Sequence, residues 1–192
     1  MNEVLKCILE RRSIRRYRPE QIMEGDLDAI LRAGLYAPNA GSRQSAVIAV
    51  CQNAQINAEL GRINKAAYHG VVSEGYISRD QPSIADDAAL PSGFYSAPTV
   101  LTLFAQKDLR FGAADCCVAA ENMMLVAHSL GIGSCMVGRA EDTFASERGQ
   151  QIQAQWGIGA DCEAKMHVLL GYPASAQATA KPRKEHRVMR IQ

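Results

Sequence analysis

Apolar positions recur along the chain at two spacings, one typical of helices and the other of strands. Apolar side chains three and four residues apart predict helices over residues 4–9, 26–36, 54–68 and 143–155. Short unbroken apolar runs predict buried strands over residues 46–51, 99–105 and 166–170. Because helices separate these strands, the pattern predicts a layered architecture in which helices pack on a sheet.

Residues 114–130 form the longest predicted helix, and its apolar side chains lie on almost every side. A helix of this kind is buried over most of its surface. In a chain of 192 residues, a second protomer that covers one face would make such burial easier. The segment therefore favours an obligate dimer, and a central core helix of a monomer is the alternative.

Two segments interrupt the periodic pattern. Residues 131–138, GIGSCMVG, follow a helix and enter a short strand, so they do not form the strand-to-helix fingerprint of dinucleotide-binding folds. Their glycines would let the backbone approach a flat ligand, although a helix cap followed by a turn explains them equally well. Residues 69–95 predict a long excursion or partly mobile cap. We interpret its aromatic side chains as anchors in the core rather than as a stacking surface for substrate.

Composition indicates a single globular domain over residues 1–192, with 47% apolar and 21% charged residues. The net charge of +1 argues against general nucleic-acid binding. The chain has no run of 18 apolar residues and no secretion signal, so we expect a cytoplasmic protein without a membrane span. Its six cysteines show no CxxC and no histidine at metal-ligand spacing, which predicts reduced thiols and no metal site.

Arginines cluster around Ser13 in the sequence RRSIRRY at residues 11–17. Guanidinium groups match phosphate oxygens with two parallel hydrogen bonds, and a serine hydroxyl adds a small neutral donor. The cluster predicts a phosphate-bearing ligand, with a solvated basic stretch as the alternative. A second basic cluster lies at residues 181–187, where a solvated tail is the simplest interpretation.

Four stretches of the chain, in their order and spacing, resemble the FMN-dependent nitroreductase family. They are RRSIRRY at 11–17, APNAGSRQ at 37–44, AAENMMLVAHSLGIGSCMVG at 119–138, and LLGYPA followed by KPRK between 169 and 184. The resemblance implies an α+β fold of three layers, with a central, mainly antiparallel sheet between helices. It also implies an intertwined homodimer that holds two FMN molecules in its interface, with residues 187–192 adding a strand to the partner's sheet.

The resemblance further implies which residues hold the cofactor. Arg11 and Ser13 would bind the FMN phosphate, and Arg12 would support the phosphate and ribityl contacts. Arg15 would lie at the pyrimidine edge of the flavin, where a cation stabilises the negative charge of the reduced ring. The phosphate site would be completed by Lys181 and Arg183. Arg16 is left over, and we expect it to be exposed or paired with an acid.

Further contacts with the flavin ring are implied from two other parts of the chain. Backbone amides around Cys135, Val137 and Gly138 would face flavin N5 and O4. The other protomer would contribute Pro38, Asn39, Ala40 and Ser42, with Gln44 close behind. The chain departs from the usual family pattern at Ser42, at residues 45–46 and at Met136, where asparagine, Pro-Trp and tryptophan are common. These departures concern the choice of substrate more than flavin binding.

The implied function is hydride transfer from NADH or NADPH to flavin N5, and then to a nitroaromatic, quinone or activated alkene in a ping-pong cycle. The flavin carries this chemistry, so no side chain is assigned as a catalytic acid or base. Three alternatives stay open. They are a flavin-binding store or sensor without nicotinamide turnover, a relative with flavin-destroying or dehalogenase activity, and a module that binds an anionic partner through the basic clusters.

Overall fold

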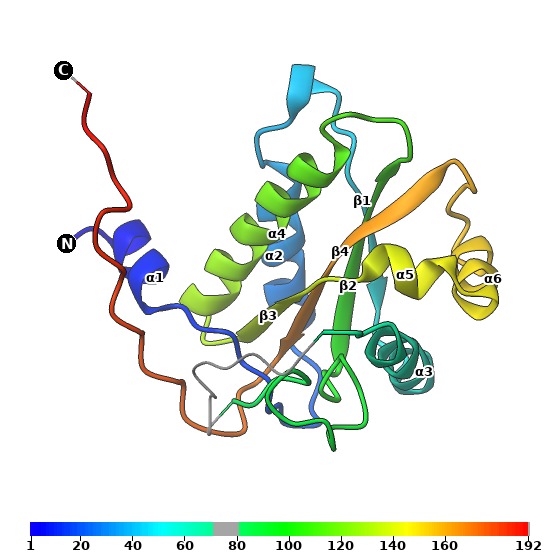
Figure 1. Ribbon diagram of the computed structural model, residues 1–192, viewed down its shortest axis with the longest axis horizontal. Helices are drawn as coiled ribbons and strands as arrows, with labels where there is room; N and C mark the ends of the chain where they lie inside the picture. The colour runs from blue at the N-terminus through cyan, green and yellow to red at the C-terminus, as the bar shows by residue number, and fades with distance from the viewer. Residues whose placement is uncertain (71–80, 192) are drawn as a thin grey trace.

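A computed structural model describes residues 1–70 and 81–191 of the chain. Four strands form one antiparallel sheet in the order β1-β2-β4-β3 (Figure 1). Their bounds are β1 (Val47–Cys51), β2 (Thr99–Gln106), β3 (Gly133–Val137) and β4 (Cys162–Gly171). In the sheet that these residues form, β2 and β4 are central, and β1 and β3 are the edges.

Helices cover both faces of the sheet and make three layers (Figure 1). One face carries α2 (Glu24–Leu35) and α4 (Gly112–Ser129). The opposite face carries α3 (Ala54–Ala66), α5 (Ala140–Ala145) and α6 (Glu147–Gln155). The predicted α+β fold, with its antiparallel sheet flanked by helices, is thereby confirmed.

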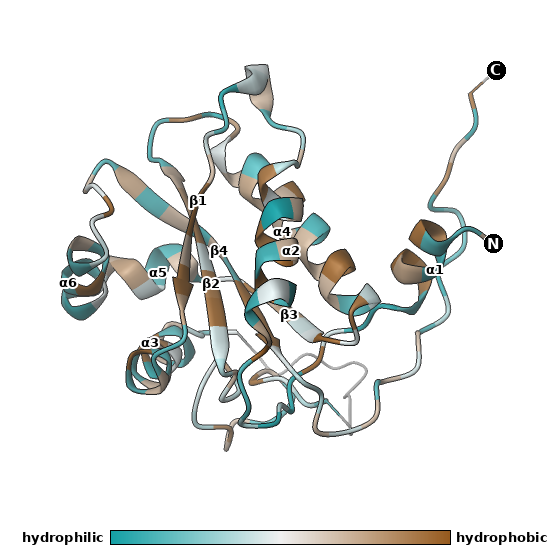
Figure 2. Cartoon of the chain, turned by 180° about the vertical axis from the view of Figure 1, so that it is seen from behind, coloured by the Kyte–Doolittle hydropathy of each residue, from teal (hydrophilic) through white to brown (hydrophobic). Residues whose placement is uncertain are grey.

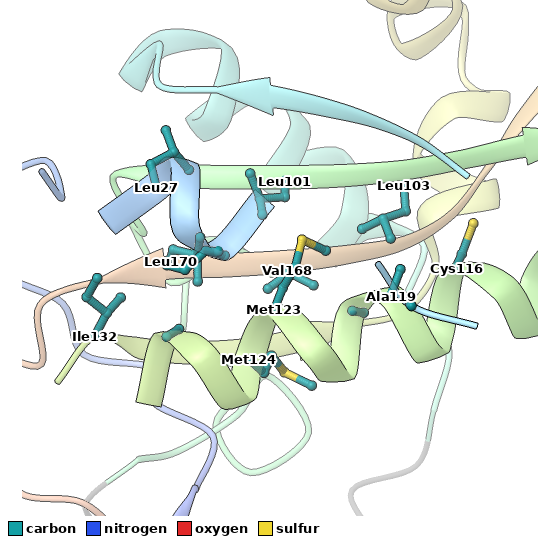
Figure 3. Close-up of a cluster of buried hydrophobic side chains, with 14 of the residues drawn as sticks. Leu27, Leu101, Leu103, Cys116, Ala119, Met123, Met124, Ile132, Val168 and Leu170 are labelled. Carbon is teal, nitrogen blue, oxygen red and sulfur yellow. The ribbon is translucent and has the colours of Figure 1, made fainter. Parts of the chain in front are cut away.

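The alternation of side chains along the central strands builds a core on each face of the sheet. On β2, Leu101 and Leu103 are fully buried against the α4 side, while Val100 and Phe104 are fully buried on the other side. Figure 3 shows Met123 of α4 beside the strand residues of the first core. Each fully buried leucine contributes about 1.5–3 kcal/mol relative to an exposed one, so these strands stabilise the scaffold that positions the two sheet edges.

The burial of α4 differs from the sequence-based expectation. Its buried positions form one broad face, whereas Val118 keeps 39% of its surface exposed and Leu125 is half-buried. The reason is that one chain supplies the sheet and α2 on one side of α4, but covers the other side less completely. The dimer predicted from this helix therefore stays a prediction.

The single helix predicted over residues 143–155 is wrong, because the chain forms α5 and α6 there with a break at Ser146. Ser146 is extended, and its hydroxyl accepts a hydrogen bond from Gly149 N, as a helix N-cap does. The strand predicted over 166–170 is longer than expected, because β4 begins at Cys162 and pairs with β2 from Cys162 to Leu170 across one register shift.

The excursion predicted over residues 69–95 is described from residue 81 onward, and Tyr76 lies outside the described residues. Residues 81–95 form turns without a helix or strand. Phe94 is 1% exposed and packs edge-on against His167, with 4.7 Å between ring centroids, so its interpretation as a core anchor is confirmed.

The N-terminal helix α1 (Glu3–Glu10) stands at the margin of the molecule (Figure 2). Its first turn is capped by Asn2, whose side-chain oxygen accepts a hydrogen bond from Leu5 N. Every residue of α1 is at least partly exposed, including an apolar face of Val4, Leu5, Ile8 and Leu9. The C-terminal tail runs near α1 and leaves the body of the molecule.

Candidate functional site

The two basic clusters of the chain meet in one cleft. Its volume is about 380 Å³, and its lining residues are Arg12, Ser13, Arg15, Ser83, Asp86, residues 178–180, Lys181 and Arg183. Five of the thirteen cofactor-binding residues expected from the sequence are thus brought together from opposite ends of the chain. The cleft carries four cationic side chains and one carboxylate, so its balance of charge favours an anion.

The wall that contains Ser13 is held by the edge of the sheet. Ser13 forms a parallel bridge with Ser134 of β3, and Ile14 N donates to the Ser134 carbonyl oxygen over 2.9 Å. Ile14 is 3% exposed, and a Cβ added at Gly133 would lie 2.9 Å from the Ile14 Cβ. Glycine at 133 therefore permits the close approach that places Ser13 in the cleft.

Arg15 is held in the cleft by contacts with Gln81 and Tyr95. Its Nη1 donates to the Gln81 carbonyl oxygen over 2.9 Å, and its guanidinium lies 5.8 Å from the centre of the Tyr95 ring. Its Nε is buried and has no hydrogen-bond partner among the described residues. A buried N–H without a partner is costly, which makes this atom a candidate donor to a bound ligand.

The titratable groups beneath Arg15 are kept neutral. Burial raises the pKa of the Cys135 thiol, with the nearby Arg15 guanidinium acting in the opposite direction. Burial likewise raises the pKa of Tyr17 well above its usual value, and that of Tyr95 to a smaller extent. The thiol and both phenols therefore keep their protons near neutral pH and add no negative charge beside Arg15.

The outer edge of β3, opposite β4, is the edge that Ser13 bridges at Ser134. Backbone groups of alternate residues in an antiparallel strand point to opposite neighbours. Because the Ser134 carbonyl oxygen accepts from Ile14, the backbone of Met136 also points to this edge, and the backbone groups of Cys135 and Val137 point to β4. Gly138 follows β3 and is exposed, with its carbonyl oxygen accepting from Asn64 Nδ2 over 2.9 Å.

The second expected group of site residues lies elsewhere in the chain. Pro38 and Asn39 line a separate cavity of about 90 Å³, next to the short turn at Ala40–Ser42. The buried carboxylate of Asp115 holds this turn, accepting from Ala40 N over 3.0 Å and from Ser45 Oγ over 2.6 Å. Asp115 lies in the first turn of α4, whereas the Ser13 wall lies beyond the end of α4.

This separation is large. From Asp115 to its end at Ser129, α4 rises by about 21 Å at the standard rise per residue. Residues 38–42 and the segment 11–17 lie toward opposite ends of α4 (Figure 1), so residues 38–42 are too far from the basic cleft of their own chain to share a small-molecule site with it.

Arg11 and Arg16 do not line the basic cleft. Arg11 lines a neighbouring cavity of about 120 Å³ that also includes Arg12 and Ser134, and its Nε lies 4.0 Å from a Glu121 carboxylate oxygen. Arg16 is exposed, as expected. The cleft also includes Ser83 and Asp86, which the sequence analysis missed because the segment 69–95 has neither periodicity nor a motif.

The described residues contain neither a helix that could span a membrane nor a cluster of side chains that could hold a metal ion. Over residues 1–70 and 81–191, no helix is both long enough and apolar enough to cross a membrane. The same ranges contain no group of three or more His, Cys, Asp or Glu side chains placed to hold a metal ion. The six cysteines are free thiols.

Comparison with known proteins decides the family. The model of the nitroreductase family matches residues 8–172, which include the Ser13 wall, the 38–42 turn, α4 and the whole sheet. The chain belongs to the nitroreductase family. An Archaeoglobus fulgidus relative, provisionally named NADH dehydrogenase/NAD(P)H nitroreductase, is 30% identical over 178 residues, which cover 90% of this chain and 87% of that one.

Solved nitroreductase structures agree with this assignment. A nitroreductase with bound FMN from Bacteroides fragilis is 29% identical, with a TM-score of 0.84 over the full length of both chains. A second nitroreductase with bound FMN, from Desulfitobacterium hafniense, is 26% identical with a TM-score of 0.83, again over both full lengths.

Proposed function

We propose that this nitroreductase-family chain is an FMN-dependent oxidoreductase, which uses NADH or NADPH to reduce a nitroaromatic, quinone or activated alkene. The observation that carries the proposal is the convergence of Arg12, Ser13 and Arg15 with the basic tail in one cleft. Two similar nitroreductases were solved with bound FMN, and the Archaeoglobus relative carries a nicotinamide-dependent name.

The residues of the cleft fit FMN by their chemistry. A phosphate needs cationic and hydroxyl donors, and Arg12, Ser13, Lys181 and Arg183 provide them. The ring of a flavin has carbonyl oxygens, and the buried Arg15 Nε is a donor without a partner among the described groups. Asp86 opposes an anion, but its carboxylate already accepts from Ser83 N and Ser83 Oγ, each over 2.8 Å.

Each wall of the cleft has a distinct role in the proposal. Arg12 and Ser13, with Arg11 behind them, would bind the phosphate from one side, and Lys181 and Arg183 from the other. Arg15 would stabilise negative charge at the pyrimidine edge of the flavin, a charge-assisted contact worth about 1.5–3 kcal/mol. When bound, FMN would supply the hydride chemistry of the reaction at its N5.

The ring-facing side of the site rests on backbone groups rather than on acids or bases. The outer edge of β3, at Met136 and the following Gly138, would present amide N–H groups to flavin N5 and O4. Cys135 and Val137 would position this edge through their ladder bonds to β4. The neutral Cys135 thiol and the neutral phenols of Tyr17 and Tyr95 would leave the charge of Arg15 available to the flavin.

We further propose that a complete site needs two copies of the chain. Pro38, Asn39, Ala40 and Ser42 lie about the length of α4 from the basic cleft of their own chain, so a second copy would bring them to the flavin. The exposed apolar face of α1 would contribute to the interface. The tail residues 187–192 would add a strand to the partner at β1, which is an open sheet edge.

The test is anaerobic reduction of the FMN-loaded protein by NADH and by NADPH, followed by a panel of electron acceptors. The proposal predicts that FMN binds and is reduced by at least one nicotinamide, and that a nitroaromatic, quinone or activated alkene reoxidises it. Protein that cannot be loaded with FMN would contradict it. Bound flavin that neither nicotinamide reduces would favour a store or sensor.

A further inference from the structure

We propose that Gln81 is a positioning residue that joins the two basic walls of the cleft, so that both contact one phosphate group. The inference rests on the proposed function, because it concerns how the same cleft selects a phosphorylated flavin. Gln81 comes from the segment without periodicity, and no cofactor contact was expected from it.

The side chain of Gln81 is fully buried and bonds to both walls. Its Oε1 accepts from Arg15 N over 2.5 Å and from Arg16 N over 3.1 Å. Both amides belong to the short segment that also contains Ser13. Its Nε2 donates to Ser175 Oγ over 2.8 Å and to Ala176 O over 3.2 Å. Residues 175 and 176 come shortly before the tail segment that lines the cleft.

This bonding pattern requires a carboxamide. Its oxygen serves the two N–H groups of the arginine segment, and its two N–H donors serve the two oxygens of the tail segment. A carboxylate would match the first wall and repel the carbonyl oxygen of the second. An apolar side chain of equal length would leave buried polar groups on both walls without their partner.

Gln81 contacts the arginine segment through its main chain as well as through its side chain. Its main-chain oxygen accepts from Arg15 Nη1, and this bond does not depend on the side chain. Replacing the side chain should therefore loosen the distance between the walls and leave the guanidinium of Arg15 close to its place. The substitution should therefore weaken binding of the phosphate, which needs both walls, more than binding of the flavin ring.

The experiment compares FMN with riboflavin, which lacks the phosphate, by flavin fluorescence on the wild-type protein and on Gln81→Met. We expect the dissociation constant for FMN to rise roughly ten-fold or more, as the loss of one charge-assisted contact would do, and that for riboflavin to change less than about two-fold. Ser175→Ala removes one acceptor of Gln81 Nε2 and should give a smaller rise for FMN.

Gln153→Met is the matched control. Gln153 is also a buried glutamine, and its Nε2 donates to Gly159 O over 2.9 Å and to Cys162 O over 3.0 Å, away from the basic cleft. It should lose a similar amount of thermal stability and keep the wild-type preference for FMN. If Gln81→Met does not fold, Ser175→Ala carries the comparison.

The outcomes separate this inference from the proposed function. Wild-type protein that binds FMN, together with a Gln81→Met variant that keeps its FMN affinity or loses FMN and riboflavin equally, would overturn the role of Gln81 alone. Wild-type protein that does not bind FMN would overturn the proposed function. In that case, the thermal shift caused by inorganic pyrophosphate would test the role of Gln81. We expect pyrophosphate to raise the melting temperature of the wild type more than that of Gln81→Met. Equal shifts would contradict the inference.

Discussion

Arg12 and Arg16 carry the same charge, lie four residues apart and have different surroundings. Arg12 lines the basic cleft, and Arg16 points its side chain to solvent. Arg12→Ala should raise the dissociation constant for FMN about ten-fold, because a charge-assisted contact with phosphate is lost. Arg16→Ala should leave it within about two-fold. Fluorescence titration with FMN makes the comparison, and equal losses would show that overall charge, rather than the cleft, binds the cofactor.

His167 of β4 makes stability depend on pH. Its side chain is fully buried beside Phe94 and Phe144, its Nδ1 lies 2.9 Å from Thr102 Oγ1, and its Nε2 has no partner in the described part of the chain. Burial, with a smaller effect of Arg139, lowers the pKa of His167 from 6.5 to about 3. The folded protein therefore holds this imidazole neutral.

The sign of the pH effect follows from linkage. Between pH 6.5 and 3 the unfolded chain binds a proton on His167 that the folded chain does not, so acid favours unfolding. Urea unfolding of the apoprotein should show a loss of about 2 kcal/mol from this group between pH 7 and pH 5. His167→Gln keeps a polar partner for Thr102 and should flatten this dependence, whatever its own stability. An unchanged dependence would contradict the burial argument.

The elements differ in how far the sequence could predict them. The strands and long helices followed from their spacing, because each buries an apolar face. The break at Ser146 was missed, because the apolar spacing continues through residues 143–155 while a serine hydroxyl stops the helix locally. The place of residues 81–95 was missed for a different reason. Gln81 and Phe94 are buried through tertiary contacts that no local pattern records.

The C-terminal segment is the element with the clearest consequence for assembly. Val188, Met189 and Ile191 are 81%, 84% and 90% exposed, which is unusual for apolar side chains so close together. A chain that ends at His186 should dimerise at least about ten-fold more weakly, as measured by sedimentation. The double variant Arg187→Gln and Arg190→Gln removes two positive charges, keeps long polar side chains and leaves the three apolar residues in place, so it should dimerise normally. Unchanged assembly of the truncated chain would contradict the proposed strand exchange.

The motifs that resemble the nitroreductase family are spread along the whole chain, and the fold brings several of them together in space. Arg12, Ser13, Lys181 and Arg183 are far apart in sequence and share one cleft. Residues 38–42, which we propose to contact the cofactor, lie at the other end of α4, so one chain could not bring both groups of residues to one flavin. The proposed second copy would bring them together, and sequence alone could not give the distance on which this proposal depends.

The most direct test of the central claim is an anaerobic titration of the FMN-loaded protein with NADH and NADPH, followed by absorbance near the flavin maximum. The proposed function predicts a yellow protein with about one FMN per chain, whose visible band bleaches on addition of at least one nicotinamide and returns when a quinone or nitroaromatic is added. A colourless protein that cannot be reconstituted with FMN, or a yellow one that keeps its colour under excess of both nicotinamides, would contradict it.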